Sequence, residues 1–268
     1  MVVSSHRIVR LTETGSTNAD AMRLARAGEA LPLWVTAERQ SAGRGRAGRE
    51  WVSKPGNLQA SLALTANAPM QKAGELSLVA GIALFEAIRA ISPLAQPRGL
   101  RLKWPNDLLI GTAKAGGILV ETTTARGEAS FHGEPGFLAV LGFGLNVETN
   151  PGIAGRAVTS LAQNGVTISA NHLLDALADR CAVWLELWDN GQVFDAIRVS
   201  WMERAGPLGE PVQVRTTAGP VSGTYQGLAP SGALLAEING RIETITYGDV
   251  DLIAAKDNWA STVKGNEQ

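Results

Sequence analysis

Gly43-Arg44-Gly45-Arg46-Ala47-Gly48-Arg49 places three glycines and three arginines within seven residues, and Glu50-Trp51 follows directly. The segment is a poor helix and a poor strand, because glycine costs backbone entropy in either. Its N–H groups can instead fold around an anion, and guanidinium groups bind carboxylate or phosphate oxygens with paired, charge-assisted hydrogen bonds. We interpret residues 43–49, the glycine–arginine loop, as a mobile loop that closes over an anionic ligand. Taken alone, the stretch also fits a solvated basic turn or an RNA-binding arginine tract.

The composition of the chain is that of an ordinary globular protein. Of its 268 residues 45% are hydrophobic and 18% are charged, and the formal net charge is −1 at pH 7. This length suits one large domain and one small domain, and the near-zero charge argues against bulk binding of nucleic acid. The single cysteine, Cys181, excludes an intramolecular disulfide and is expected to be buried within an apolar helical pattern. Three histidines and one cysteine leave no cluster for a structural zinc ion.

The first residues and the apolar runs bear on localisation. The stretch 1–7 lacks the long apolar core of a signal peptide, and no apolar run is long enough to cross a bilayer. We therefore expect a cytoplasmic protein without a membrane segment. The stretch before residue 10 is too short for a helix-turn-helix, so we expect no intrinsic DNA-binding domain.

Hydrophobic periodicity predicts a mixed α+β domain in the first three-quarters of the chain. Strand-like runs occur at 7–11, 33–37 and 57–65, on both sides of a Trp-Pro-Asn-Asp turn at 104–107, and at 114–121 and 137–147. Helical patterns occur at 19–27, 72–91, 170–188 and 194–204. Ser16 or Thr17 is a suitable N-cap for the first helix. Alternation in 57–65 predicts a half-buried strand, and the wide apolar stripe of 72–91 predicts the central core helix.

The Gly206-Pro207 step is the best domain boundary in the chain. Beyond it, short strand-like runs at 211–215, 221–227, 233–237 and 242–247 alternate with turn signals such as Asn239-Gly240. About 50 residues of this kind fit a small SH3-like β-barrel. We predict a mixed β-sheet domain with packed helices over 1–206, an SH3-like C-terminal domain over 207–256 and a frayed tail over 257–268.

The polar residues that stand out are cations, amides and hydroxyls, and they indicate the chemistry of the site. The sequence contains no P-loop, no G-x-G-x-x-G motif that opens a helix and no G-x-S-x-G nucleophile elbow. The candidates are Asn18, Gln40, Arg44, Arg46, Arg49, Lys103, Lys114 and Asn146, with Asp107 as the exception. Such a set suits binding anions and stabilising negative charge as it develops, and it does not resemble a nucleophile with its base.

Several of these side chains also have ordinary structural explanations. Ser16 and Thr17 can cap a helix, although two hydroxyls beside helix N–H groups also form a polar recognition surface. Lys103 and Asp107, four residues apart across a tight turn, can form a surface salt bridge or line a cleft. Asn146 lies in an apolar strand and needs a hydrogen-bond partner if it is buried.

Five short motifs, taken together, resemble one family. They are Gly-Ser-Thr-Asn at 15–18, Gln-x-x-Gly-Arg-Gly-Arg-x-Gly-Arg at 40–49, Lys-Trp-Pro-Asn-Asp at 103–107, Lys-x-Gly-Gly-Ile-Leu-Val-Glu at 114–121 and Gly-x-Gly-x-Asn at 142–146. In this order they resemble biotin protein ligase, in the short form without the N-terminal DNA-binding repressor domain. Each motif is weak alone, whereas five in sequence are highly specific. The resemblance implies a catalytic domain of the class II synthetase and biotin-ligase type, and the small C-terminal barrel fits it.

The resemblance implies a two-step ligase reaction. Biotin and Mg-ATP form biotinyl-5'-AMP and pyrophosphate, and the acyl group then passes to one lysine of the biotin carboxyl carrier protein of acetyl-CoA carboxylase. ATP, Mg²⁺ and biotin are thus the expected small molecules, with Mg²⁺ held through ATP rather than by an assigned protein ligand. Family members often pair through sheet edges, which leaves a homodimer open.

The resemblance also implies roles for individual residues. Biotin would be bound by Ser16, Thr17, Asn18, Gln40, Gly43, Arg44, Gly45, Arg46, Lys114 and Gly117. ATP would be bound by Arg44, Arg46, Arg49, Trp51, Lys114 and Asn146. The catalytic set would be Arg44, Arg46, Lys103, Asp107 and Lys114, with Asp107 orienting the incoming lysine. Many family loops have a further arginine where this chain has Ala47, so the ordering of the loop could differ.

Two other functions compete with this hypothesis. A lipoate or octanoate protein ligase shares the architecture and the acyl-adenylate strategy, but the glycine–arginine loop and the C-terminal strands favour biotin. A non-catalytic protein that binds RNA or a partner through the arginine loop is the second, and the near-neutral net charge argues against it.

Overall fold

The computed structural model describes residues 6–92, 97–125, 130–131, 134–153, 156–216 and 219–252. The chain divides into two compact units, the first formed by Met1–Gly206 with Pro230–Gly232, and the second by Pro207–Ala229 with the residues from Ala233 onward. The tail expected at 257–268 lies outside the described residues.

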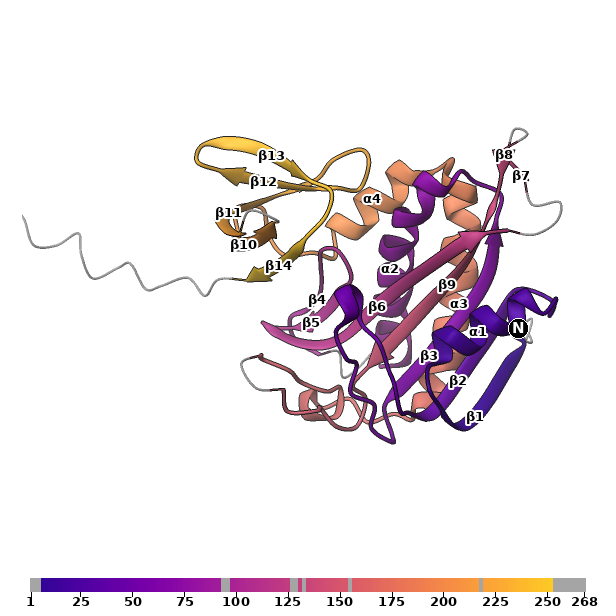
Figure 1. Ribbon diagram of the computed structural model, residues 1–268. Coiled ribbons are helices and arrows are strands. Elements are labelled where there is room, and N and C mark those ends of the chain that lie inside the picture. The colour runs from indigo at the N-terminus through magenta and orange to yellow at the C-terminus, as the bar shows by residue number, and fades with distance from the viewer. Residues whose placement is uncertain are drawn as a thin grey trace, which may run out of the picture. The chain divides into compact units, whose positions relative to one another are not determined.

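The first unit is built on a seven-stranded mixed sheet (Figure 1). In spatial order its strands are β1 (Ile8–Thr14), β2 (Leu33–Gln40), β3 (Leu58–Ala66), β9 (Phe137–Leu145), β6 (Ala113–Thr124), β5 (Asp107–Ile110) and β4 (Leu100–Lys103). The pair β1–β2 is parallel and the other neighbours are antiparallel. The carboxyl ends of β1, β2 and β9 and the amino ends of β3 and β6 therefore lie side by side at the same end of the strands.

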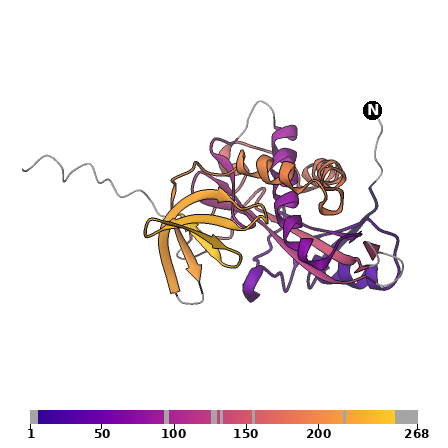
Figure 2. The same cartoon turned by 90° about the horizontal axis from the view of Figure 1, so that it is seen from above.

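Helices cover both faces of this sheet (Figures 1 and 2). The helix α1 (Thr17–Arg26) lies on one face, and α2 (Glu75–Ile91) and α3 (Ala170–Trp188) lie on the other, with α4 (Phe194–Met202) packed against α2. The prediction of a half-buried strand at 57–65 is therefore wrong. Ser61 and Ala63 are fully buried, because α1 covers the face that alternation assigned to solvent.

Serine side chains cap the amino ends of two helices. Ser16 is the N-cap of α1 and accepts a hydrogen bond from the Ala19 N–H at 3.5 Å. α3 has the predicted bounds, and its N-cap Ser169 accepts from the His172 N–H at 3.2 Å. Cys181 on α3 is buried as expected, and burial raises the pKa of its thiol. No helix among the described residues has both the length and the apolar character needed to cross a membrane.

Short elements complete the first unit. Four 3₁₀ turns lie at Arg46–Gly48, Met70–Gly74, Ala162–Asn164 and Asp189–Gly191. A two-stranded ribbon is formed by β7 (Ser130–Phe131) and β8 (Glu134–Pro135).

The second unit is a five-stranded antiparallel sheet. Its spatial order is β13 (Arg241–Ile245), β12 (Leu234–Ile238), β11 (Gly219–Leu228), β10 (Pro211–Thr216) and β14 (Asp249–Leu252). Val212, Leu234 and Val250 contribute to its buried core. The sequence predicted four of these strands and missed β14. The end strands β13 and β14 do not pair within the described residues, so the structure shows an antiparallel sheet there and no closed barrel.

Candidate functional site

A pocket lies where the five strand ends meet. Its walls come from the turn that opens α1, the end of β2 and the glycine–arginine loop, the start of β6 and the end of β9. It is lined by Ser16, Thr17, Asn18, Gln40, Arg44, Gly45, Arg46, Arg49, Glu50, Trp51, Val52, Asn106, Lys114, Gly117, Ile118, Leu119, Gly142, Phe143, Gly144, Asn146, Pro151, Ile153, Arg156 and Val158. The order of the strands in the sheet thus brings residues from between positions 16 and 158 together in one site.

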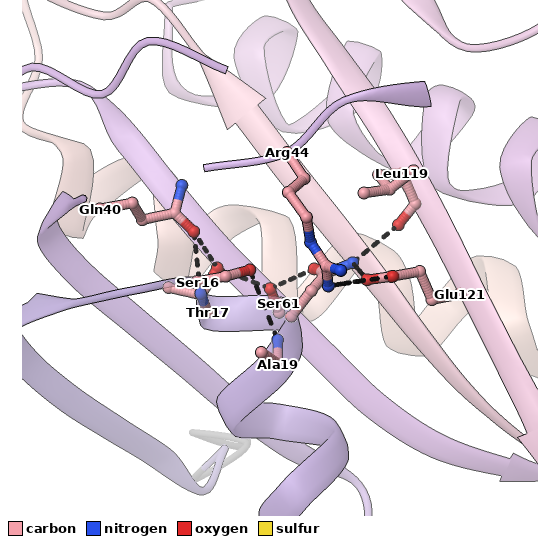
Figure 3. A network of polar contacts seen from close by, with 9 residues as sticks. Ser16, Thr17, Ala19, Gln40, Arg44, Ser61, Leu119 and Glu121 are labelled. Atoms are coloured by element: carbon pink, nitrogen blue, oxygen red, sulfur yellow. Dashed lines mark hydrogen bonds and ion pairs between the residues drawn. The ribbon is translucent and has the colours of Figure 1, made fainter. Parts of the chain in front are cut away.

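Hydrogen bonds hold the turn at 16–18 rigidly against the sheet (Figure 3). The backbone N–H and the hydroxyl of Thr17 both donate to Gln40 Oε1, at 2.8 and 3.0 Å. Ser61 Oγ, on β3, lies 2.8 Å from Thr17 Oγ1 and 2.6 Å from Asn18 Oδ1. Ser16, Thr17 and Asn18 are all buried while still lining the pocket. They therefore combine capping with the presentation of polar groups to a ligand, the two uses weighed for this turn.

The Asn18 amide also contacts β6. Its Nδ2 donates to Glu121 Oε2 at 2.8 Å and to the Leu119 carbonyl at 3.3 Å. The same Glu121 carboxylate pairs with Arg44 of the glycine–arginine loop, with 3.1 Å between Arg44 Nη2 and Oε1 (Figure 3). One carboxylate therefore contacts both the buried turn and the loop.

The glycine–arginine loop has a defined backbone. The Gly45 N–H donates to the Arg49 carbonyl at 2.7 Å, and Arg44 and Glu50 form an isolated antiparallel bridge. Ala47 has φ 54°, a left-handed conformation that an alanine adopts only at a cost of about 1 kcal/mol. Arg46 Nη1 donates to Asn106 Oδ1 at 3.3 Å, which ties the loop to the β4–β5 turn.

Asp107 joins two lysines at the edge of the pocket. Its Oδ2 lies 2.9 Å from Lys103 Nζ, and its Oδ1 forms a short ion pair with Lys114 Nζ. Burial alone would raise the pKa of the Asp107 carboxyl, but the charges of Lys114 and Lys103 outweigh it, and the pKa lies below its ordinary value. The cluster is largely buried, so it is more than the surface salt bridge that spacing alone allowed.

The backbone around Lys114 is fixed by a passing segment. The Lys114 N–H donates to the Ala157 carbonyl and its carbonyl accepts from the Thr159 N–H, both at 2.9 Å. A Cβ added at Gly117 would lie 3.1 Å from Lys114 Nζ, so the bare glycine leaves room for the ammonium group. Lys114 therefore projects from a rigid strand start into the pocket.

Two glycines of β9 admit neighbouring side chains. A Cβ at Gly142 would lie 2.2 Å from Asn18 Oδ1, and a Cβ at Gly144 would lie 2.4 Å from the Trp51 ring. These positions require glycine because Asn18 and Trp51 pack directly on the strand backbone.

Two buried polar atoms that belong to lining residues lack partners within the described part of the chain. They are the indole donor Nε1 of Trp51 and the amide acceptor Oδ1 of Asn146. Asn146 Nδ2 donates to the Thr159 carbonyl at 3.0 Å, so the side chain is held in place while its oxygen stays unpaired. Because buried polar atoms are normally hydrogen-bonded, both indicate a ligand that presents an acceptor and a donor.

Most of the predicted site residues line this pocket. Those that do not are Gly43, Lys103 and Asp107, although Asp107 contacts the lining residue Lys114. The sequence assigned no role to Asn106, Glu121, Gly142, Gly144 and Arg156. The first four lie within quoted motifs, which was the available signal, whereas Arg156 lies in no motif and only the tertiary structure brings it to the pocket. Among the described residues no group of three or more His, Cys, Asp or Glu side chains could hold a metal ion.

Two family models match the chain. Residues 8–137 match the biotin/lipoate A/B protein ligase family, and residues 208–253 match the biotin protein ligase C terminal domain. A biotin–[acetyl-CoA-carboxylase] ligase of Paracoccus denitrificans is 37% identical over 233 residues, which cover 84% of this chain and 92% of that protein. A protein of the same name from Mycobacterium tuberculosis is 31% identical, covering 90% of this chain and 86% of that protein.

Solved structures have the same fold. A biotin protein ligase from Aquifex aeolicus, in complex with biotin and ATP, matches with a TM-score of 0.74 and 26% identity, covering 92% of this chain and 98% of that one. A biotin acetyl coenzyme A carboxylase synthetase from Helicobacter pylori matches with a TM-score of 0.58 at 22% identity, which shows the fold alone.

Proposed function

This chain belongs to the biotin/lipoate A/B protein ligase family, and on that premise we propose the reaction that its pocket performs. Biotin and ATP form biotinyl-5'-AMP and pyrophosphate. The biotinyl group then passes to one lysine of the biotin carboxyl carrier protein of acetyl-CoA carboxylase. The chain is thus an ATP-dependent, AMP-forming biotin ligase.

One observation carries this proposal: a single pocket combines three kinds of polar surface. The buried turn at 16–18 offers neutral hydrogen-bonding groups, which suit the ureido ring of biotin. Arg44, Arg46 and Lys114 offer positive charge, which suits the biotin carboxylate and the α-phosphate. The unpaired atoms of Trp51 and Asn146 suit the donor and acceptor edge of a nucleotide base.

In the first step a biotin carboxylate oxygen attacks the α-phosphorus of ATP. The new O–P bond forms as the bond to the leaving pyrophosphate breaks, so atoms and charge balance without an added redox partner. Both reactants are anions, and their repulsion opposes the reaction. The arginines and Lys114 offset it, and one positioned donor of this kind contributes ~3 kcal/mol to transition-state stabilisation.

In the second step the amine of the acceptor lysine attacks the acyl carbon and AMP leaves. The mixed anhydride reacts with water, so the glycine–arginine loop closes over it until the acceptor arrives. Asp107 is already ionised between two lysines. Its first task in this proposal is to position Lys114, and its second is to orient the incoming amine.

Magnesium belongs to the proposal through ATP. Mg²⁺ is commonly bound by substrate phosphates together with one or two carboxylates and water, and it neutralises charge on the phosphates. Among the described residues no group of three or more acidic, histidine or cysteine side chains could hold a metal ion, so the ion would be bound through the ATP phosphates. No protein ligand is assigned.

The wider organisation of the molecule is also proposed. We propose that residues 1–206 form the catalytic domain and residues 207–256 an SH3-like module, and that the reaction takes place in the cytoplasm. The edge strand β1 is a candidate surface through which two copies associate as a homodimer. Size-exclusion chromatography with multi-angle light scattering measures the molar mass and so distinguishes a monomer from a homodimer.

The deciding experiment is ATP–pyrophosphate exchange with biotin, lipoate and octanoate as alternative acids. We expect exchange with biotin alone, followed by labelling of a biotin carboxyl carrier domain detected with avidin. The matched family also covers lipoate ligases, which makes lipoate the second candidate. Exchange with lipoate or octanoate in place of biotin would reverse the choice, and no exchange with any acid would remove the ligase function.

A further inference from the structure

Glu121 is the one charged residue of the 114–121 motif that the reaction above does not use. It lies on β6, behind the pocket wall, and borders a second depression outside the pocket together with Asn18 and Arg44. Its side chain is 33% exposed. An exposed ion pair of this kind usually contributes little to stability, about 0–1 kcal/mol. The carboxylate is nevertheless placed where two site residues from distant parts of the chain meet.

The contact with Asn18 determines how that amide presents its two ends. Asn18 Nδ2 is occupied by Glu121 Oε2 at 2.8 Å and by the Leu119 carbonyl at 3.3 Å. Its Oδ1 is therefore turned to the other side, where it lies 2.6 Å from Ser61 Oγ and against the bare backbone of Gly142. A flipped amide would place its oxygen against two acceptor oxygens, so the flip is excluded while Glu121 is ionised.

The contact with Arg44 joins the loop to the same group. Arg44 Nη2 lies 3.1 Å from Oε1 and 3.2 Å from Oε2 of Glu121, and the Arg44 side chain is half exposed. The glycine-rich backbone gives the loop little stiffness of its own. The Glu121 carboxylate lies on a central strand, so its ion pair with Arg44 restricts where the loop can move.

We propose that Glu121 is a positioning residue for biotin, which orients the Asn18 amide and holds Arg44 with one carboxylate. The inference rests on the proposed biotin ligase function. Glu121 touches neither biotin nor ATP in this scheme. It acts by holding the Asn18 amide and the Arg44 side chain in the arrangement that biotin requires before biotin binds. This lowers the free-energy cost of ordering these two groups on binding.

The test is Glu121→Gln, which keeps the size of the side chain and removes its charge. One end of the glutamine can still accept from Asn18, but its amide nitrogen can no longer pair with Arg44. We expect the KM for biotin in pyrophosphate exchange to rise about tenfold, equivalent to ~1.4 kcal/mol. We expect kcat at saturating biotin to stay within about twofold of the wild-type value. Once bound biotin has ordered Asn18 and Arg44, the chemical step is unchanged. Glu121→Asp keeps the charge and should restore part of the biotin affinity.

A matched control separates positioning from a general loss of charge. Glu13 on β1 pairs with Arg39 on β2 at 3.1 Å, and neither residue lines the pocket. Glu13→Gln therefore makes the same chemical change outside the site. It should leave both kinetic constants at the wild-type values. An unchanged biotin KM in Glu121→Gln, or a fall in kcat with KM unchanged, overturns the proposal. If Glu121→Gln does not fold, the biotin KM of Glu121→Asp decides: a raised value supports the role and a wild-type value overturns it.

The two levels of inference fail in different ways. Wild-type protein that shows no biotin-dependent exchange overturns the function itself, before any variant is made. Wild-type protein that turns over biotin, alongside a Glu121→Gln variant of equal biotin KM, overturns the role of Glu121 and leaves the function intact.

Discussion

Asp107 shows how one buried carboxylate can serve both stability and catalysis. Two lysines of the first unit contact it, one from the end of β4 and one from the start of β6. Without the carboxylate, Lys103 and Lys114 would face each other as like charges in a partly desolvated place. Breaking such an arrangement by removing one partner costs more than the intact arrangement contributes.

Asp107→Asn should lower the free energy of unfolding at neutral pH by about 1–3 kcal/mol. Burial raises the pKa of Asp107 and the two lysines lower it further than that, so the folded-state pKa lies below the ordinary value. Its contribution is therefore fully present above the unfolded-state pKa of about 4 and is lost as the pH falls through the folded-state pKa. Urea unfolding of both proteins at pH 7, 5 and 3 should show the difference in stability shrinking only at the lowest pH. A difference independent of pH would contradict this account.

Lys114 is the cation that we place at the reacting centre. Lys114→Ala should keep biotin binding but slow adenylate formation by more than about tenfold, equivalent to ~1.4 kcal/mol in the barrier. Calorimetry measures the binding, and single-turnover release of pyrophosphate measures the step. Arg241→Ala removes an exposed cation of β13 in the second unit and should change neither. Wild-type rates in Lys114→Ala would exclude Lys114 from the mechanism.

Among the elements, β9 illustrates what periodicity can and cannot predict. Its apolar run predicted a buried strand at 137–147, and the structure confirms one at Phe137–Leu145. The run does not say what lies over its glycines. That depends on α1, whose Asn18 packs on Gly142, and on the segment after the glycine–arginine loop, whose Trp51 packs on Gly144.

Gly144→Ala tests the packing of Trp51. The added Cβ would lie 2.4 Å from the indole ring, so the ring must move. Since we propose that Trp51 borders the nucleotide, the KM for ATP should rise about tenfold, equivalent to ~1.4 kcal/mol of binding free energy. Gly74→Ala is the control, because Gly74 has φ −63° and nothing within 4 Å of an added Cβ. An unchanged KM for ATP would place Trp51 outside the nucleotide site.

The second sheet shows where local signals fall short. Turn residues such as Asn239, with φ 51°, and Gly240, with φ 74°, lie where the hairpin signal placed them. The strand β14 was missed because it has only four residues, two charged and two apolar in alternation, which is too short for a period to be recognised. Whether strand ends close into a barrel depends on pairing between distant segments, which local alternation does not encode.

For the molecule as a whole, the glycine–arginine loop is the part expected to change with ligand. Its base is fastened to the α1 turn, with the Ser41 N–H donating to the Thr14 carbonyl and the Ala42 N–H to the Gly15 carbonyl, both at 2.9 Å. Beyond that base, contacts of its arginines with Glu121 and Asn106 tie the loop to the rest of the sheet. The Arg44 side chain is half exposed, and solvent-exposed contacts of this kind favour local opening.

Hydrogen exchange measures this opening. Amides of residues 43–49 should exchange rapidly in the ligand-free protein and slow by at least about tenfold on addition of biotin, equivalent to ~1.4 kcal/mol of local stability. The amides of β10–β12 in the second unit serve as the internal control and should not change. Full protection of the loop without ligand would contradict its role as a closing element.

The sequence by itself determined the local elements, the family and the anion-binding character of the site. Capping residues, turn residues and short-range periodicity act between neighbours along the chain, so they can be recognised without coordinates. This is why α3 was predicted with its observed bounds, and why Ser16 or Thr17 was predicted as the N-cap of α1, which the structure shows to be Ser16. The five motifs likewise occur in order along the chain.

Only the tertiary structure decided which of these groups share partners. Glu121 contacts Asn18 across 103 residues and Arg44 across 77, and those contacts exist because the sheet order places β6 beside β9 and within reach of α1 and the loop. The same order buries both faces of β3, and it brings Asn146 to the pocket with its Oδ1 unpaired among the described residues. Long-range pairing of this kind depends on strand order and on what covers each face, and neither is a property of any short stretch of sequence.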